Sequence, residues 1–179
     1  MYRYQKAFTL IELMVTVTIA AIVLGIAIPS FNTQIQNSRS VALGEELASA
    51  FIFARSEAVK RGQRVSSCAS SDGAACGGGW NGGWMVFLDG ANTDNAAAVV
   101  VNNVLRYWDD IDNQAVVTVS NNKTFVRFTG LGALGRVDNN FITVSARFQK
   151  CVNDNANTIT IGLSGIVNTE RDACPAGGN

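Results

Sequence analysis

A single glutamate lies within a long apolar stretch near the start of the chain. Residues 8–28 are apolar apart from Glu12 and a few small polar residues. A helix of this length would span roughly 31 Å, about the thickness of the hydrocarbon core of a membrane. A carboxylate at the centre of a bilayer costs about 2.5–3.5 kcal/mol, so Glu12 is a candidate for a functional role with a positive partner. The alternative is that Glu12 only extends to the membrane interface, which its position four residues from Phe8 permits.

Two basic residues, Arg3 and Lys6, precede the apolar stretch, and no acidic residue does. Basic residues before a span keep the N-terminus in the cytoplasm, so we expect the remainder of the chain to cross the membrane. A cleaved secretory signal is the alternative interpretation. Against it, the stretch is long, and no small-residue cleavage site separates it from a polar mature sequence.

The four cysteines are Cys68, Cys76, Cys151 and Cys174. An even number of cysteines in an oxidising compartment favours disulfides. Three pairings are open, and we favour Cys68–Cys76 with Cys151–Cys174 because these pairs close the shortest loops. The spacings lack the paired C-x-x-C pattern of structural zinc sites, so we expect neither a metal site nor a cofactor.

The 179-residue chain contains no histidine. Imidazole is the usual proton acceptor for serine and cysteine nucleophiles and the commonest metal ligand. The acidic residues in the asparagine-rich loops have no evident base or nucleophile beside them. We therefore expect no catalytic residues and a protein that is not an enzyme. A hydrophobic fraction of 47% with 16% charged residues also excludes a disordered polyelectrolyte.

The formal net charge is zero, but the charges are unevenly distributed. Residues 1–67 carry seven basic and four acidic side chains, whereas residues 68–179 carry seven basic and ten acidic ones. The C-terminal part would therefore repel a polyanion at long range unless its arginines gather on one face.

One long helix is expected from Phe8 to about Arg61, with Gly62 as its stop signal. Pro29 removes the hydrogen bond to the carbonyl of Gly25, which predicts a kink or a locally unwound turn. The second half of the helix has an apolar stripe at helical spacing, which we expect to form core against a sheet. The stripe consists of Leu43, Leu47, Ala50, Phe51, Ala54 and Ala58.

Short β-branched and aromatic runs, separated by breaks rich in Asn, Asp and Gly, follow the helix. The expected strands are residues 64–68, 84–88, 99–108, 115–119, 124–128, 141–148 and 158–163. The fold class is α+β, with the long N-terminal helix packed on an antiparallel β-sheet head. We expect Trp80 and Trp84 to be core or rim aromatics rather than a ligand platform.

The segment Lys6-Ala7-Phe8-Thr9-Leu10-Ile11-Glu12-Leu13-Met14 resembles the class III signal of type IV pilins and type II secretion pseudopilins. In that family, a prepilin peptidase removes a short basic leader just before a phenylalanine, and the fifth mature residue is glutamate. The resemblance implies cleavage between Ala7 and Phe8 and methylation of Phe8, with Glu12 as the fifth mature residue. Ala7 stands where the family usually has glycine.

The resemblance also supplies a positive partner for Glu12. In such fibres the mature N-terminus is an ammonium, so Glu12 of one subunit would face the Phe8 ammonium of its neighbour. Opposite charges in a dry bundle are stable only when paired. Glu12 and Pro29 are thus the implied assembly residues, and other minor pilins and the major pilin are the implied partners.

The implied division of the chain is that of a pilin lollipop. Residues 1–7 would be the leader, residues 8–28 the transmembrane and assembly half of the helix, and residues 29–62 its amphipathic half. Residues 63–179 would form the β-rich head, periplasmic while the subunit is a single-pass protein of the bacterial inner membrane. After assembly the subunit would lie in a fibre at the cell surface.

Two further segments are similar to the GspH/FimT family of minor pilins and pseudopilins. They are residues 53–62 (FARSEAVKRG) and residues 80–89 (WNGGWMVFLD), the second of which matches the family pattern W-x-x-G-W-x-x-F-x-D. With the N-terminus, the resemblance covers about residues 6–90 well and the rest loosely. It implies a minor pilin of a type IV pilus that helps to start assembly, and the alternative is an H-type pseudopilin of type II secretion.

A third interpretation is a receptor for DNA in natural transformation. Some FimT-like members bind DNA through a GRxR motif, and the nearest match is residues 135–138 (GRVD), with an acid in place of the second arginine. The candidate DNA contacts are Arg127, Arg136, Arg147 and Lys150. Scattered solvated cations are the simpler interpretation, so nucleic acid is the less favoured partner.

Overall fold

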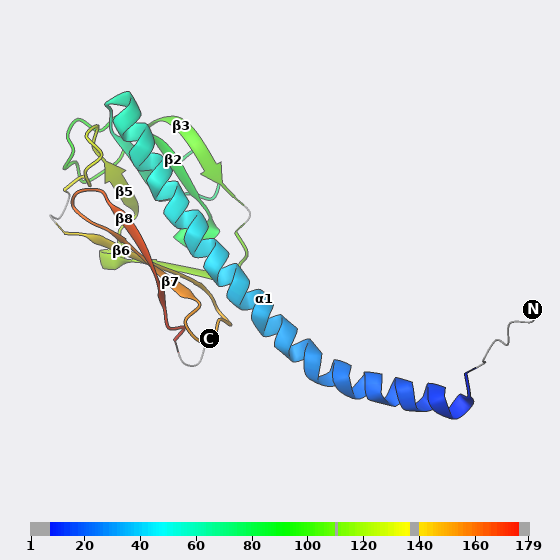
Figure 1. Ribbon diagram of the computed structural model, residues 1–179. Helices are drawn as coiled ribbons and strands as arrows, with labels where there is room; N and C mark the ends of the chain where they lie inside the picture. Colours follow the sequence, from blue (N-terminus) through cyan, green and yellow to red (C-terminus); the bar gives the residue numbers. More distant parts are fainter. Residues whose placement is uncertain (1–7, 110, 137–139, 176–179) are drawn as a thin grey trace, which may run out of the picture. The chain divides into compact units, whose positions relative to one another are not determined.

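The computed structural model describes residues 8–109, 111–136 and 140–175. By its internal contacts the chain divides into two units, residues 1–35 and residues 36–179. Helix α1, Leu10–Arg61, contributes to both units, and every strand belongs to the second (Figure 1).

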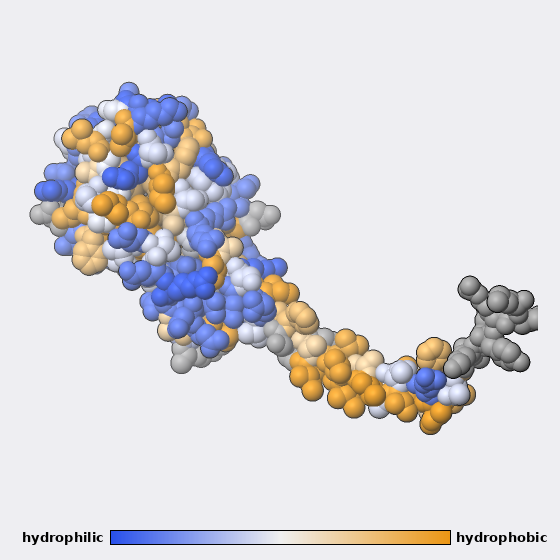
Figure 2. All heavy atoms as spheres, in the orientation of Figure 1, coloured by the Kyte–Doolittle hydropathy of each residue, from blue (hydrophilic) through white to orange (hydrophobic). Residues whose placement is uncertain are grey.

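In the first unit, α1 exposes its apolar side chains all round (Figure 2). The helix is long and apolar enough to cross a membrane. The hydroxyls of Thr16 and Thr18 form hydrogen bonds within the helix, because they donate to the carbonyls of Leu13 and Met14 at 2.9 and 2.7 Å. Internal satisfaction of this kind is what a segment surrounded by hydrocarbon requires.

The start of α1 differs by two residues from the expected start at Phe8. Thr9 is the N-cap, and its hydroxyl accepts a hydrogen bond from the Glu12 amide at 3.3 Å. The helical backbone continues through residues 28–30. The side chain of Pro29 lies outside the described residues, so the kink stays a prediction.

In the second unit, the expected apolar stripe of α1 is buried throughout, with Leu47, Phe51 and Ala54 at 0% exposure. The helix then ends as expected at Gly62, which adopts a φ of +62°. The amides of Gly62 and Gln63 donate to the carbonyls of Val59 and Ala58 at 3.3 and 3.2 Å. This is a Schellman cap, in which glycine takes the left-handed conformation without a Cβ penalty.

The head contains two antiparallel four-stranded sheets, an arrangement that the expected strand series left open. The first has the order β3-β2-β1-β5, with β1 at Val65–Ala69, β2 at Trp84–Asp89, β3 at Val101–Trp108 and β5 at Phe125–Phe128. The second has the order β4-β6-β7-β8, with β4 at Ala115–Val119, β6 at Ile142–Phe148, β7 at Ala156–Ile161 and β8 at Val167–Asp172. Two 3₁₀ turns, Trp80–Gly82 and Ser120–Asn122, precede β2 and follow β4.

Seven strands lie within two residues of the expected positions, and β8 was missed. β8 has the sequence VNTERD, and five of its six residues are exposed. It is an edge strand that pairs only with β7, so no buried face imposes an alternating apolar pattern on its sequence. Charged residues on an exposed edge also discourage pairing with another chain.

One hydrophobic core joins the α1 stripe to the inner faces of both sheets. Trp80 and Trp84 are 6% and 0% exposed and belong to this core, as expected. A second, smaller cluster lies on the outer face of the first sheet and is formed by Cys68, Met85, Phe87 and Phe125.

The second sheet contacts α1 through polar groups as well as apolar ones. The Ser40 hydroxyl accepts a hydrogen bond from the Phe148 amide at 2.9 Å, and the Asn157 amide group donates to the Ser40 carbonyl at 3.0 Å. Gly44 lies one turn further along, where a Cβ would overlap the side chain of Asn157. The helix therefore approaches β7 closely only because residue 44 has no side chain.

Candidate functional site

Glu12 lies at the third helical position of α1, two residues after the first. Its side chain is exposed among large apolar side chains that are themselves at least 59% exposed, including Ile11, Leu13 and Met14. The positive end of a helix dipole favours a carboxylate in the first turn. In a water-free bundle of such helices, however, the carboxylate would still need a cation from outside its own described segment.

The processing site lies at the boundary of the described residues. Ala7 is outside them, and Phe8 is the first residue inside, with 76% of its surface exposed. Cleavage between the two and methylation of Phe8 therefore stay predictions.

Both favoured disulfides are present, and no cysteine is free. Cys68–Cys76 fastens the loop after β1 to the outer face of the first sheet, with 5.6 Å between the Cα atoms. Cys151–Cys174 fastens the segment after β8 to the loop between β6 and β7, with a Cα separation of 5.8 Å. Among the described residues, no group of Cys, Asp and Glu side chains is arranged to hold a metal ion.

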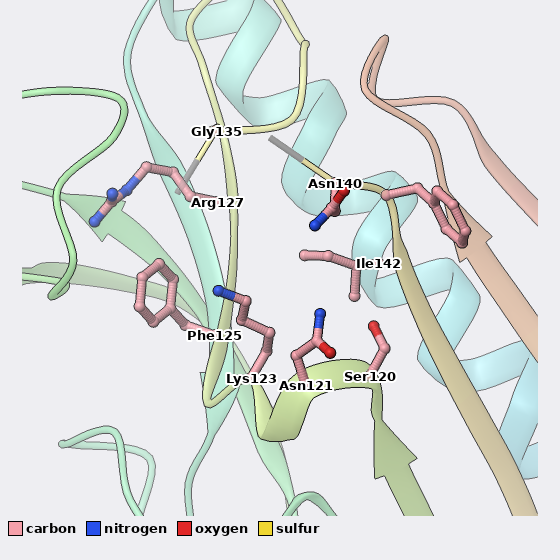
Figure 3. A pocket seen from close by; sticks show the side chains of 9 residues that line it. Ser120, Asn121, Lys123, Phe125, Arg127, Gly135, Asn140 and Ile142 are labelled. Atoms are coloured by element: carbon pink, nitrogen blue, oxygen red, sulfur yellow. The ribbon is translucent and has the colours of Figure 1, made fainter. Parts of the chain in front are cut away.

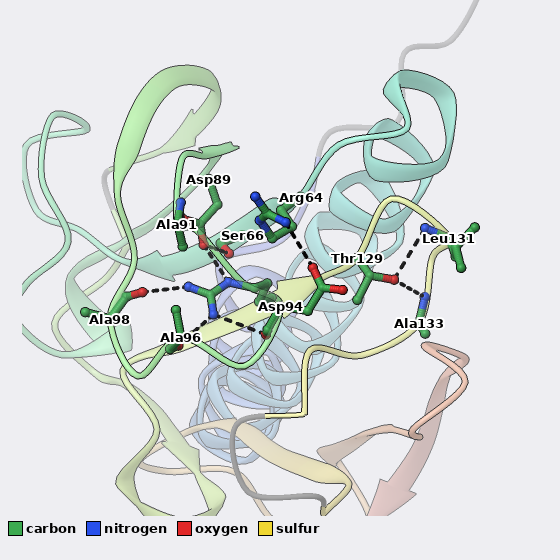
Figure 4. Close-up of polar contacts among 11 residues, drawn as sticks. Arg64, Ser66, Asp89, Ala91, Asp94, Ala96, Ala98, Thr129, Leu131 and Ala133 are labelled. Atoms are coloured by element: carbon green, nitrogen blue, oxygen red, sulfur yellow. Dashed lines mark hydrogen bonds and ion pairs between the residues drawn. The ribbon is translucent and has the colours of Figure 1, made fainter.

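The most elaborate polar site of the head is a buried ion pair between Asp89 and Arg127 (Figure 4). Both side chains are 0% exposed, and Arg127 Nε lies 2.7 Å from Asp89 Oδ2. The same oxygen accepts a hydrogen bond from the Ser66 hydroxyl at 2.6 Å, and Oδ1 accepts from the amides of Ala91 and Val100 at 3.0 Å each. Burial alone would raise the pKa of Asp89, but these hydrogen bonds outweigh it and hold the pKa below its ordinary value.

The guanidinium of Arg127 also holds the loop between β2 and β3. Its Nη1 donates to the carbonyl of Ala96 at 2.6 Å, and its Nη2 donates to that of Ala98 at 2.7 Å. A third, longer contact reaches the carbonyl of Asp94 at 3.3 Å. The pair thus connects β2, β5 and an eleven-residue loop, residues 90–100, into one rigid unit.

The W-x-x-G-W-x-x-F-x-D segment therefore has a structural explanation. Trp84 packs on Trp108 with 6.3 Å between ring centroids, Phe87 belongs to the outer cluster, and Asp89 anchors Arg127. The sequence predicted Asp89 only as part of this pattern. Nothing in the sequence around Arg127 indicated that its side chain would be buried in β5.

The prediction that Arg127 is a candidate DNA contact is therefore wrong. Its side chain has no exposed surface, and its donors are bonded within the head. A phosphate group could reach it only if the ion pair were broken, which would leave Asp89 as an uncompensated buried charge.

The other three candidate cations are not gathered into one patch. Arg136 is exposed beside β5, where the Gly135 amide donates to the Arg127 carbonyl at 2.7 Å. Arg147 is half-buried near the end of β6, and Lys150 is exposed just beyond that strand. The Leu134 amide donates to the Leu163 carbonyl, which places the segment before Arg136 near the Ile142 end of β6. Lys150 follows the other end of β6, so the length of that strand, about 23 Å, separates the two cations.

Figure 3 shows a hollow between β5, the turn after β4 and the start of β6. Asn121, Asn140 and Ile142 point into it, whereas the guanidinium of Arg127 points away. Its volume is about 20 Å³, close to that of a single water site. The hollow offers no room for an organic substrate.

A long apolar N-terminal helix, with its second half packed on antiparallel sheets, is the architecture of type IV pilin-like proteins. Residues 2–28 match the family described as the prokaryotic N-terminal methylation motif. Residues 43–165 match the family described as Type II transport protein GspH. The chain belongs to the GspH family.

Solved structures support the same fold. The chain is similar to the type IV minor pilin FimU of Pseudomonas aeruginosa, at 21% identity and a TM-score of 0.59, over 76% of this chain and 93% of that one. A second crystal form of FimU gives 21% identity and a TM-score of 0.56, over 74% and 95% of the two chains. A comparison with curated proteins gave no match.

Proposed function

We propose that the chain is a minor pilin of a type IV pilus, a structural subunit without catalytic activity that helps to start fibre assembly. The observation that carries the proposal is Glu12, an exposed carboxylate in a helix segment whose other large side chains are apolar and exposed. Such a surface is stable in a membrane or a helical bundle, and the carboxylate then requires a cation.

The cation is the Phe8 ammonium of a neighbouring subunit, which prepilin peptidase creates by cutting after Ala7. Methylation of Phe8 keeps the positive charge. Before assembly, the subunit is held in the inner membrane by α1 with its head in the periplasm, and the two disulfides suit that oxidising compartment. In the fibre, the first half of α1 contacts other minor pilins and the major pilin.

Glu12 also bears on the subunit's position in the fibre. A subunit at the extreme tip has no neighbour above it to provide a second ammonium. A subunit that keeps Glu12 therefore has another subunit above it, so we infer that this chain connects a tip complex to the shaft.

The second candidate is an H-type pseudopilin of a type II secretion apparatus. It is favoured by the description of the family that matches residues 43–165. Both assemblies use the same helix and the same pairing of Glu12. Deleting the chain separates them, because loss of surface fibres with normal secretion supports the pilin, and the reverse supports the pseudopilin.

A DNA receptor has little support from the head. With Arg127 buried, three dispersed cations remain, and phosphate contacts need several cations along one surface. We expect the head to bind DNA weakly, without sequence preference, and with a steep loss on adding salt. Submicromolar binding near 150 mM salt that is lost in Arg136→Ala would support the receptor instead.

The test of the proposed function compares Glu12→Ala with Glu45→Ala in a deletion strain. Glu45 is an exposed glutamate of the same helix, but it lies in the head unit. Glu12→Ala should leave the chain in the membrane at normal abundance and reduce its content in sheared fibres at least tenfold, whereas Glu45→Ala should not. Mass spectrometry of the wild type should find a methylated terminus at Phe8. Normal incorporation of Glu12→Ala, or a mature start beyond residue 28, would contradict the proposal.

A further inference from the structure

Four exposed apolar side chains surround the junction of two turns and α1 at the end of the head where the helix terminates. We call them the distal patch: Val59, Leu131, Leu163 and Ile166, with exposures of 53%, 92%, 38% and 52%. The space-filling view shows apolar side chains interrupting the hydrophilic surface of the head (Figure 2). Grouped apolar residues on an otherwise polar surface mark an interaction site more often than scattered ones do.

The distal patch is held rigidly. The Thr129 hydroxyl accepts hydrogen bonds from the amides of Leu131 and Ala133 at 3.3 Å each (Figure 4). Arg55 Nε donates to the Gly132 carbonyl at 2.9 Å. Gly132 and Gly165 approach so closely that a Cβ on either would collide with its neighbours. Leu131 is thus presented at a fixed position, so that little conformational entropy is lost when a partner binds it.

A polar cleft of about 590 Å³ lies beside Leu131, between residues 62–64, the loop after β2 and residues 129–131. Arg64 lines it and contacts Asp94 at 3.2 Å through Nη1, but its Nε is buried without a hydrogen-bond partner. A buried donor without a partner is unfavourable. A carboxylate entering the cleft would draw the guanidinium toward itself and satisfy this donor.

The net charge of the head differs between its two ends, which are defined by the direction of α1 from Gln36 to Arg61. Trp80 and Trp108 contact Phe51 and Phe53, so the segments that contain these tryptophans lie nearer Arg61 than Gln36. The segments nearest Gln36 hold seven acidic and four basic described side chains, and those nearest Arg61 hold four acidic and eight basic ones. The former are residues 36–46, 109–115, 145–158 and 170–174, and the latter are residues 47–108, 116–144 and 159–169. The Arg61 end of the head is therefore positive and the Gln36 end negative. The Arg61 end of one head would thus attract an acidic Gln36 end of another head.

The Gln36 end also carries a groove that complements an apolar knob. The groove has a volume of about 340 Å³ and lies between α1 and the segment after β3. Leu43, Ile111 and Phe148 contribute its apolar lining. Its charged groups are Glu46, Asp112 and Arg39, and Arg39 pairs with Asp112 at 3.1 Å. One end of the head thus carries an exposed leucine beside an arginine. The other end carries an apolar groove whose lining has two acidic side chains and one basic one.

Resting on the proposed function, we propose that the distal patch docks onto the Gln36 end of the next pilin-class head along the fibre. Leu131 enters an apolar groove there, and Arg64 pairs with an acidic side chain of that groove. Contacts between unlike ends of successive subunits produce open filaments rather than closed rings. This head contact would add to the contact between the helices.

The first experiment places a photo-crosslinking amino acid at Leu131 of the full chain in fibre-forming cells. Asn103, exposed on edge strand β3, is the matched control position. We expect a crosslink from position 131 to one pilin-class subunit, at least tenfold stronger than from position 103. Equal crosslinking from both positions, or crosslinks to lipid alone, would overturn the inference.

The second experiment separates apolar contact from charge. Leu131→Asp and Leu131→Lys both remove the leucine, but only aspartate places an acid against an acidic groove. With equal abundance in the membrane, we expect Leu131→Asp to lower the content of the chain in sheared fibres at least tenfold and Leu131→Lys less than threefold. Equal losses would contradict an acidic partner, and normal incorporation of both would contradict docking.

The outcomes distinguish this inference from the proposed function. If wild-type chain is absent from surface fibres but crosslinks from position 131 to a pseudopilin, the pilus assignment fails and the docking surface stands. If Glu12→Ala blocks assembly while position 131 crosslinks no more than position 103, the assignment stands and the docking surface is overturned.

Discussion

Glu12 and Asp89 are two carboxylates in apolar surroundings. The two regions that contain them differ in whether they provide partners for the negative charge. Asp89 is fully buried and receives hydrogen bonds from two side chains and two amides of its own head. Glu12 is exposed, and no cation lies near it among the described residues of its unit. The head thus satisfies its buried carboxylate with its own groups, whereas the described residues of the first unit provide no such cation for Glu12.

The comparison also explains the different sequence patterns of the two regions. The head needs a stripe, alternating strands and crosslinks because it must bury one side of each element. The first half of α1 is apolar on every side, the pattern expected of a helix that lipid or other helices surround. Changes in the interior of the head should therefore alter the stability of the single chain, and changes in the first half of α1 should alter assembly.

The largest predicted effect on stability comes from Arg127→Ala. Removing one partner of a buried ion pair leaves the other as an unpaired charge and costs about 3–5 kcal/mol. The loop that Arg127 holds through two short hydrogen bonds to Ala96 and Ala98 should also loosen. Urea denaturation of the full chain in detergent measures the loss, and increased protease cleavage within residues 90–100 reports the loop.

The matched control is Arg136→Ala, because Arg136 is exposed. It should change the free energy of unfolding by less than about 0.5 kcal/mol. Equal effects of the two substitutions would mean that the buried pair does not set the stability of the head.

The second prediction concerns the disulfides. Replacing both cysteines of either pair by alanine should lower the free energy of unfolding by about 2–4 kcal/mol, because each bond restricts the unfolded chain. The pair Cys151–Cys174 closes a loop of 23 residues and Cys68–Cys76 one of 8, so the former should have the larger entropic share. Denaturing the wild type without reductant should expose no reactive thiol. Four labelled thiols would contradict the disulfide assignment.

Much of this architecture follows from the sequence alone. The apolar stripe of α1, the stop at Gly62 and seven strands could be predicted because each depends on a local period or a local backbone preference. The division into two sheets could not, because it depends on which strands pair across long separations. β8 could not be predicted because an exposed edge strand needs no apolar pattern. The burial of Arg127 could not be predicted because its partner Asp89 lies 38 residues earlier in the sequence.

The third prediction compares a glycine from each region. At Gly44 a Cβ would overlap Asn157, so Gly44→Ala should cost about 1–3 kcal/mol by overpacking. At Gly25 a Cβ would meet no described atom within 4 Å outside the backbone of its own helix, so Gly25→Ala should not destabilise the single chain. Denaturation in detergent measures both variants, and fibre content is read separately. A stability loss in Gly25→Ala similar to that in Gly44→Ala would contradict the contrast between the two regions.

The smallest effect is a pH dependence that belongs to the head. The pKa of Asp89 is lowered in the folded protein because its hydrogen bonds outweigh the opposing effect of burial. Its stabilising contribution is therefore fully present above the pKa of the unfolded chain, about 3.9, and is lost as the pH falls through the folded pKa. One carboxylate changes the free energy of unfolding by at most about 1.4 kcal/mol per pH unit, so denaturation between pH 6 and pH 3 should show a gradual decline. Ser66→Ala removes a hydrogen bond to Asp89 and should make the decline shallower. A slope that is identical in wild type and Ser66→Ala would show that the acid sensitivity arises outside the buried pair.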